Sequence, residues 1–175
     1  MYSVYETYIK WESVLIELEN EFQKIDSAFQ KGKSLSNIVE RKAISGMTFE
    51  EIVYFYDTTI KSLRLYESVD LFACFEKMIF DDAEERKKDS KRILYNKLCK
   101  LNLTNTKVSK LIDIWRTHLK SKLSKKIFVC IDNARQHRNW VAHGCRFQCQ
   151  TQTPPQPVEL YHAIKVVFQE ISATQ

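Results

Sequence analysis

A regular spacing of apolar residues marks the first thirty positions of the chain. Eight apolar residues alternate steps of four and three without a break: Val4, Tyr8, Trp11, Leu15, Leu18, Phe22, Ile25 and Phe29. This spacing predicts one long helix with a narrow packing face, as in a coiled coil or a helical bundle. The helix is expected to run from about residue 3 to Gly32, because glycine commonly ends helices.

Similar stripes continue through the middle of the chain. Residues 34–46 are compatible with a short helix, and Thr48 followed by Glu51 is the pattern of a capping box at the next helix start. Ser68 is expected to cap a further helix. The stretch 81–92, which mixes both signs of charge, is interpreted as a solvated helix face or a connection.

Three more helices are expected in the second half. Residues 102–106 have the composition of a turn, and the stripe after them consists of Val108, Leu111, Ile112, Trp115 and Leu119. A helix follows the lysine-rich junction at 120–126, with an apolar stripe from Ile127 and an end at Gly144. The proline-rich stretch 150–157 predicts a loop, and Pro157 is suited to open a last helix.

The composition agrees with an all-helical protein. Only three glycines and three prolines occur in 175 residues, so the chain has few residues that favour turns. We therefore expect an all-α fold, an antiparallel bundle of about five to six helices, in a single domain over residues 1–175.

Charge and cysteine content indicate which partners and which cellular compartment are compatible with the sequence. The net charge of +5 is compatible with an acidic partner such as nucleic acid, although many proteins carry this charge without one. The five cysteines form no C-x-x-C pair, as expected for reduced thiols. No signal peptide pattern and no apolar run of about 18 residues is visible, so we expect a cytoplasmic protein without a membrane segment.

The stretch RQHRNWVAHGCRF, residues 135–147, gathers most of the candidate chemistry. Arg138 falls on an apolar seam that also includes Ile127, Ile131, Ala134 and Val141. An arginine in a packing face is costly unless its charge is paired. A carboxylate within the bundle would satisfy it, and so would a bound phosphate held by two parallel hydrogen bonds.

A polar line runs beside this seam. Asp132, Gln136, Asn139 and His143 follow one another at helical spacing, and Gly144 predicts that the helix ends just after His143. The negative end of the helix dipole favours a protonated imidazole at that place. Arg138 and His143 point about 140° apart on an ideal helix, so they would converge at the helix end or across a contact between two copies of the chain.

The segment RNWVAHG (138–144) resembles the R-x4-H signature of HEPN domains, all-α domains that include many ribonucleases. The order of long helices, motif, loop and final helix is also similar. The resemblance implies metal-independent RNA cleavage, without a cofactor, at a cleft shared by the two subunits of a homodimer, in a toxin or defence effector. It also implies a candidate partner, an antitoxin such as a nucleotidyltransferase.

The resemblance assigns roles to the motif residues. Arg138 would hold the phosphate and stabilise the transition state, Asn139 would orient its neighbours, and His143 would move protons, for which the ordinary histidine pKa of about 6.5 is suited. Arg135 and Arg146 could add phosphate contacts. Trp140 could stack on a base or pack in the core.

Other interpretations remain open for these residues. Lys125 and Lys126 belong to a lysine-rich junction, 120–126, that could guide RNA or form a solvated surface. Some HEPN toxins have a tyrosine two residues after the histidine, modified by the antitoxin; Cys145 stands there in this chain. The same fold could also serve as a non-catalytic module that binds RNA, a nucleotide or a protein, or as a bundle whose first helix pairs with a partner helix.

The remaining histidines and cysteines offer weaker candidates. His143, Cys145 and Cys149, with His162 as a fourth ligand, could bind zinc, but the spacing matches no common zinc site, and we expect no metal. His137 is interpreted as a solvated residue. His118 and His162 are both interpreted as structural residues.

Overall fold

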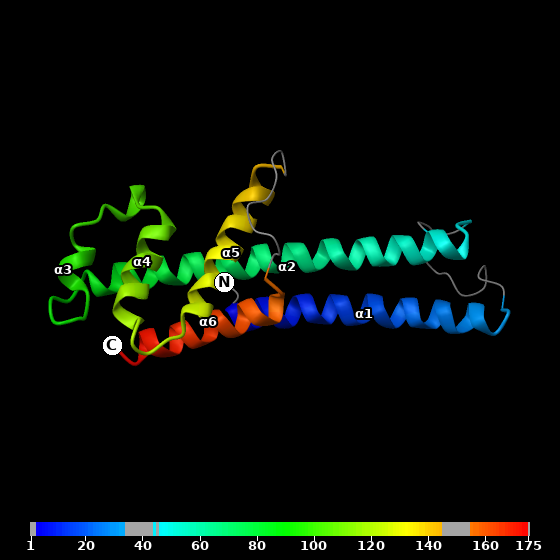
Figure 1. Cartoon of the computed structure of the whole chain (residues 1–175), viewed down its shortest axis with the longest axis horizontal. Helices are drawn as coiled ribbons and strands as arrows, with labels where there is room; N and C mark the ends of the chain where they lie inside the picture. Colours follow the sequence, from blue (N-terminus) through cyan, green and yellow to red (C-terminus); the bar gives the residue numbers. More distant parts are fainter. Residues whose placement is uncertain (1–2, 34–43, 45, 145–154, 175) are drawn as a thin grey trace. The chain divides into compact units, whose positions relative to one another are not determined.

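The computed structural model describes residues 3–33, 44, 46–144 and 155–174. Within these residues the chain forms six α-helices and a short 3-10 helix, and no strand (Figure 1). They are α1 (Val4–Gln30), α2 (Phe49–Arg86), α3 (Tyr95–Leu98), η3 (Leu103–Asn105), α4 (Val108–Leu119), α5 (Lys125–Ala142) and α6 (Pro157–Ser172). The predicted all-α class is confirmed. None of the described helices is both long and apolar enough to cross a membrane.

The chain divides into two compact units. Tyr8–Glu67 form one, here called the hairpin unit. Met1–Thr7 and Ser68–Gln175 form the other, here called the motif unit because it contains the R-x4-H segment. Both α1 and α2 contribute residues to the two units. The single domain over residues 1–175 stays a prediction.

The hairpin unit consists of most of α1 and the first half of α2. These helices lie side by side and run in opposite directions (Figure 1). Its core is formed by Leu18, Ile25, Ile44, Ile52 and Tyr56. Leu18, Phe22 and Ile25 of the predicted apolar face therefore pack with Ile52 and Tyr56 of α2, whereas Phe29 at the end of that face is 42% exposed.

The end of α1 and the start of α2, on either side of their connection, both follow local rules. Gly32 has a left-handed φ of +65°, and the amide of Lys33 donates to the carbonyl of Ala28 at 3.0 Å, as in a glycine-terminated helix. The capping box is confirmed: the amide of Thr48 donates to Glu51 Oε2 at 2.7 Å, and the amide of Glu51 donates to Thr48 Oγ1 at 3.3 Å. The predicted short helix at 34–46 falls largely outside the described residues.

The helix α2 continues where a new start was predicted. Ser68 does not cap a helix; it lies in the middle of α2, is buried, and donates its hydroxyl to the carbonyl of Pro155 at 3.3 Å. No glycine or proline lies between residues 49 and 86, so nothing in the backbone ends the helix there.

In the motif unit, the second half of α2 packs with α4, α5 and α6. Phe75 of α2 meets Phe168 of α6 edge to face, with ring centroids 5.8 Å apart. The buried residues include Leu71, Phe72, Phe75, Ile79, Leu111, Ile112, Trp115, Leu119, Phe128, Ile131, Leu160, Ile164, Val167 and Ile171. The stripe predicted for α4 is thus buried in all positions but Val108, and Pro157 opens α6 as predicted.

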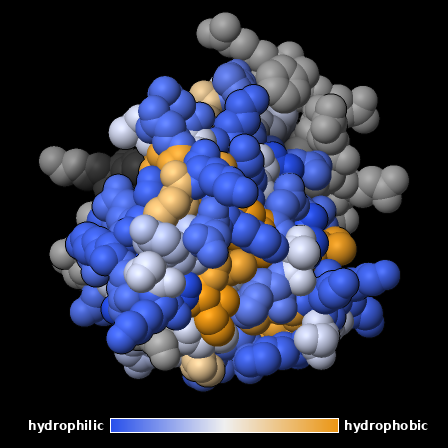
Figure 2. Space-filling model, turned by 90° about the vertical axis from the view of Figure 1, so that its left-hand side faces the viewer, coloured by the Kyte–Doolittle hydropathy of each residue, from blue (hydrophilic) through white to orange (hydrophobic). Residues whose placement is uncertain are grey.

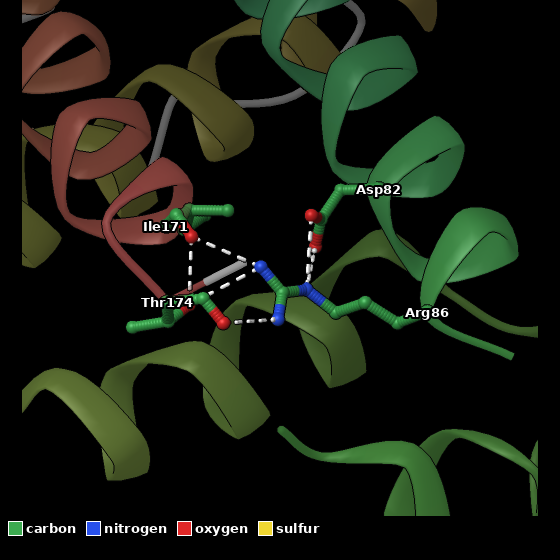
Figure 3. Close-up of polar contacts among 4 residues, drawn as sticks. All are labelled: Asp82, Arg86, Ile171 and Thr174. Carbon is green, nitrogen blue, oxygen red and sulfur yellow. Dashed lines mark hydrogen bonds and ion pairs between the residues drawn. The ribbon is translucent and has the colours of Figure 1, made fainter. Parts of the chain in front are cut away.

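The charged stretch 81–92 contains a buried arginine that its sequence did not suggest. The Arg86 side chain is fully buried; its Nε donates to both oxygens of Asp82 at 3.0 Å, and its Nη2 donates to the carbonyl of Ile171 at 2.9 Å (Figure 3). The Thr174 carbonyl accepts from Nη1 at 3.3 Å, and the guanidinium lies 4.7 Å from the Trp115 ring. The interpretation as a solvated face is therefore wrong at this position, where Arg86 joins α2, α4 and the end of α6.

The visible surface is mainly hydrophilic. Figure 2 shows one face of the molecule, on which apolar residues appear in narrow bands between hydrophilic side chains. Such a distribution is ordinary for a surface in contact with water.

Candidate functional site

The candidate motif occupies the C-terminal end of α5. The helix ends through His143, whose amide donates to the carbonyl of Asn139 at 3.0 Å, and through Gly144, whose amide donates to the carbonyl of Val141 at 2.9 Å. Gly144 has a left-handed φ of +67°, a conformation that costs glycine little. The predicted termination at Gly144 is confirmed, and it places His143 at the helix end.

The buried face of α5 is rotated from the predicted seam. Phe128, Ile131, Ala134 and His137 are the buried residues of this helix. His137, predicted to be solvated, is 2% exposed, and Arg138 is only half-buried beside it. The prediction for His137 is therefore wrong. It lies among the buried residues of α5, a helix that contacts α6.

His137 is a buried imidazole whose surroundings favour the neutral form. Neither ring nitrogen has a hydrogen-bond partner in the described part of the chain, and the ring lies 5.5 Å from the Trp140 ring. Burial lowers the pKa of His137, because a charged imidazolium would lose its hydration there. This histidine is a packing residue rather than a proton donor at the surface.

Arg138 is paired with a carboxylate of another helix. Its Nη2 donates to Glu76 Oε2 of α2 in an ion pair, and its Nη1 donates to Asn139 Oδ1 at 3.1 Å. The Arg138 side chain is 33% exposed and that of Glu76 is 24% exposed. The carboxylate expected as one of two ways to pair Arg138 is thus present, and water still reaches both partners.

Glu76 is the site residue that the sequence reasoning missed. It is the single acidic residue in the apolar run LFACFEKMIF (71–80). An isolated carboxylate in such a run was a signal that it faces a cation, but the sequence does not say which one.

Asn139 connects the two ends of the motif. Its side chain accepts from Arg138, and its carbonyl accepts from the amide of His143. The His143 side chain itself is exposed. The structure therefore places the Arg138 guanidinium against the Asn139 side chain, and the exposed His143 one turn after Asn139 at the end of the same helix.

The flanking candidates are placed differently. Arg135 lies 3.7 Å from Asp132, which also forms an ion pair with Arg116 of α4. Its guanidinium is therefore engaged with an acid on the side of α4. Trp140 is half-buried and packs beside the ring of His137, which accords with the predicted core role.

Lys125 and Lys126 lie at the opposite end of α5. Eighteen residues separate Lys125 from His143, which corresponds to about 27 Å along a helix axis. The structure therefore does not bring these lysines together with the motif, and a phosphate bound at Arg138 would lie beyond their reach. Their contact with a longer RNA stays a prediction.

Arg146 and the cysteines of the zinc interpretation, Cys145 and Cys149, lie outside the described residues. Within the described ranges, no group of three His, Cys, Asp or Glu side chains lies in a metal-binding arrangement.

Comparisons with known proteins identify no relative. No family model, no curated protein and no solved structure matches this chain. Its function must therefore be argued from its own residues.

Proposed function

We propose that this protein is a HEPN-type, metal-independent RNA endonuclease, with Arg138, Asn139 and His143 as its reacting and binding groups. The observation that carries the proposal is that Arg138 contacts the Asn139 side chain while the exposed His143 ends the same helix, α5. A cation for a phosphate and an exposed imidazole for proton transfer are the two groups that cleavage beside a ribose hydroxyl requires.

The reaction needs no group beyond protein side chains and the RNA itself. The ribose 2′-oxygen bonds to the adjacent phosphorus while the bond from phosphorus to the 5′-oxygen breaks. An imidazole accepts the 2′-hydroxyl proton, and a protonated imidazole donates one to the leaving 5′-oxygen. The products are a 2′,3′-cyclic phosphate and a 5′-hydroxyl. In the proposed homodimer, the two copies of His143 would supply the two imidazoles.

The ion pair with Glu76 defines how Arg138 would act. Because both side chains are partly exposed, the guanidinium can exchange one carboxylate oxygen for a phosphate oxygen without entering a dry environment. Until then, Glu76 holds the guanidinium in place. Glu76 is thus a positioning residue in this proposal.

The first test is incubation of the pure protein with a mixed RNA pool in the presence of a chelator, with analysis of the product ends. We expect cleavage that leaves 2′,3′-cyclic phosphates and that disappears in His143→Ala. The matched control is His162→Ala, an exposed histidine of α6, which should retain activity. Equal loss in both variants, or equal cleavage by wild type and His143→Ala, would refute the role of His143.

A second candidate function is a non-catalytic module of the same fold that binds RNA. The existing Glu76–Arg138 ion pair favours it, because a paired arginine can serve binding without chemistry. This module predicts saturable RNA binding, measured by fluorescence anisotropy, without cleavage. Arg138→Ala should weaken binding, and Glu76→Gln should strengthen it, since the carboxylate no longer competes with the phosphate. If neither variant changes RNA affinity while both remain folded, Arg138 has only a structural role.

A further inference from the structure

A hollow of about 530 Å³ lies at the other end of α5, where α4 and α5 meet. We call it the lysine-rimmed groove, lined by Arg116, Thr117, Lys120, Leu123, Lys125, Phe128, Val129 and Asp132. All of these residues belong to the motif unit. The volume falls within the usual range for pockets that accept small ligands or side chains, about 300–1,000 Å³.

The apolar residues of the lining are Leu123, Phe128 and Val129, here called the floor of the groove. Val129 is 55% exposed although its neighbour Phe128 is 4% exposed. The Arg116 guanidinium lies over the Phe128 ring, 5.5 Å from its centroid. With the aromatic ring buried, the floor offers the carbon atoms of Leu123 and Val129 to an incoming group.

The charges inside the groove cancel, whereas those at its rim do not. Arg116 pairs with Asp113 at 3.0 Å and also with Asp132, the acidic residue of the lining. Lys120 and Lys125 are exposed, and neither has an ion-pair partner among the residues that the structure describes.

The backbone adds to this positive rim. Lys125 is the first residue of α5, and the end of a helix where amides are free carries partial positive charge. Ser124 caps one amide, that of Lys126, at 3.2 Å. The rim therefore has two independent sources of positive charge, the lysine side chains and the helix end, and both attract negative groups.

The apolar floor and the positive rim together indicate what kind of molecule binds in the groove. We propose that the lysine-rimmed groove docks an acidic peptide segment of a partner protein, with an apolar side chain on Val129 and Leu123. Its carboxylates would meet Lys120 and Lys125. A protein segment fits better than RNA because a base would need an open aromatic face, and the Phe128 ring is covered.

This inference is independent of the proposed function. Fourteen residues separate Val129 from His143, which corresponds to about 21 Å along α5. An acidic segment at the groove would therefore not occupy the motif. Accordingly, His143→Ala should bind the segment as wild type does, whether or not the protein cleaves RNA.

The test uses the full chain and a labelled probe peptide of about twelve residues, in which two leucines one helical turn apart are surrounded by Asp and Glu. A second peptide replaces both leucines with serine. The variants are Val129→Glu, which closes the floor, and Lys125→Glu, which reverses the rim. Lys165→Glu, an exposed lysine of α6, makes the same charge change elsewhere. A single-stranded RNA of similar length is the competitor.

We expect the leucine peptide to bind and the serine peptide to bind at least about tenfold more weakly. Val129→Glu and Lys125→Glu should each weaken binding by about tenfold, and Lys165→Glu by less than about twofold. Helix content measured by circular dichroism should be equal in all variants. Equal affinity for both peptides, an unchanged Kd in Val129→Glu, or no binding of the leucine peptide would overturn the proposal. RNA that binds more tightly and depends on the same residues would assign the groove to nucleic acid instead.

Discussion

Replacing Glu67 with glutamine should change the pH dependence of stability. The Glu67 side chain is fully buried in α2, and its carboxylate oxygens have no hydrogen-bond partner in the described part of the chain. Its nearest cation, Arg64, lies 3.7 Å away and is also engaged with Glu12 at 3.0 Å. Glu67 is therefore a buried acid with weak compensation.

The size of the effect follows from its pKa. Burial, together with the negative charge of Glu12, raises the pKa of Glu67 from 4.5 to about 7, against the opposing effect of Arg64. Each pKa unit corresponds to about 1.4 kcal/mol, so ionisation of Glu67 costs the folded state about 3 kcal/mol relative to the unfolded chain.

The raised pKa of Glu67 determines whether stability rises or falls with pH. Between pH 4.5 and about 7 the folded chain holds the proton that the unfolded chain has released, so the contribution of Glu67 to stability falls as pH rises. Below pH 4.5 both states are protonated and the carboxyl costs nothing. Glutamine resembles the protonated acid at every pH.

We therefore expect Glu67→Gln to be as stable as wild type near pH 4.5 and more stable by about 3 kcal/mol near pH 8.5. Urea denaturation at both pH values measures the difference directly. Glu17→Gln, an exposed change in α1, is the control and should show no such pH dependence. If the free energy of unfolding of the variant differs from that of wild type by the same amount at every pH, the reasoning is refuted.

Three further predictions concern stability. Arg86→Met should destabilise the protein by about 3 kcal/mol in urea denaturation, because Asp82 loses its buried cation, and adding Asp82→Asn should restore part of the loss. Thr48→Ala should cost about 1 kcal/mol, seen as a lower melting temperature in circular dichroism, because it removes one half of the capping box. Because burial lowers the pKa of His137, its contribution to stability is present above pH 6.5 and is lost as pH falls below it, so His137→Phe should reduce acid sensitivity in a pH series of urea denaturation curves.

Local pattern was sufficient where a helix end or a face depends on neighbours in sequence. The steps of four and three predicted α1, and Thr48 and Gly144 marked helix ends correctly. The prediction failed at Ser68, because a serine occurs both as a cap and inside a helix, and no glycine or proline between residues 49 and 86 interrupts α2. It failed again at His137, because the sequence does not show which of the two adjacent positions, 137 or 138, faces the core of the motif unit.

Charged residues in the interior were the least predictable, because most of their partners come from distant parts of the chain, although Asp82 lies one helical turn before Arg86. Arg86 donates hydrogen bonds to carbonyls at the end of α6, more than eighty residues away in the sequence. Arg138 forms an ion pair with Glu76, sixty-two residues away. No spacing within a helix specifies such pairs. The sequence could state that Arg138 needs an anion, but not that Glu76 supplies it.

The partners of Arg86 and Arg138 differ, and this difference indicates which arginine has a structural role and which is a candidate for function. Arg86 has two carboxylate contacts, two carbonyls and a ring around it and no exposure, so an incoming phosphate would have to displace an intact network. Arg138 has one carboxylate and a neighbouring amide, and a third of its side chain remains in water. Exchange of a partner costs less where solvent already reaches both sides of the ion pair. Of the two arginines, Arg138 is thus the one whose environment suits reversible binding of an anion.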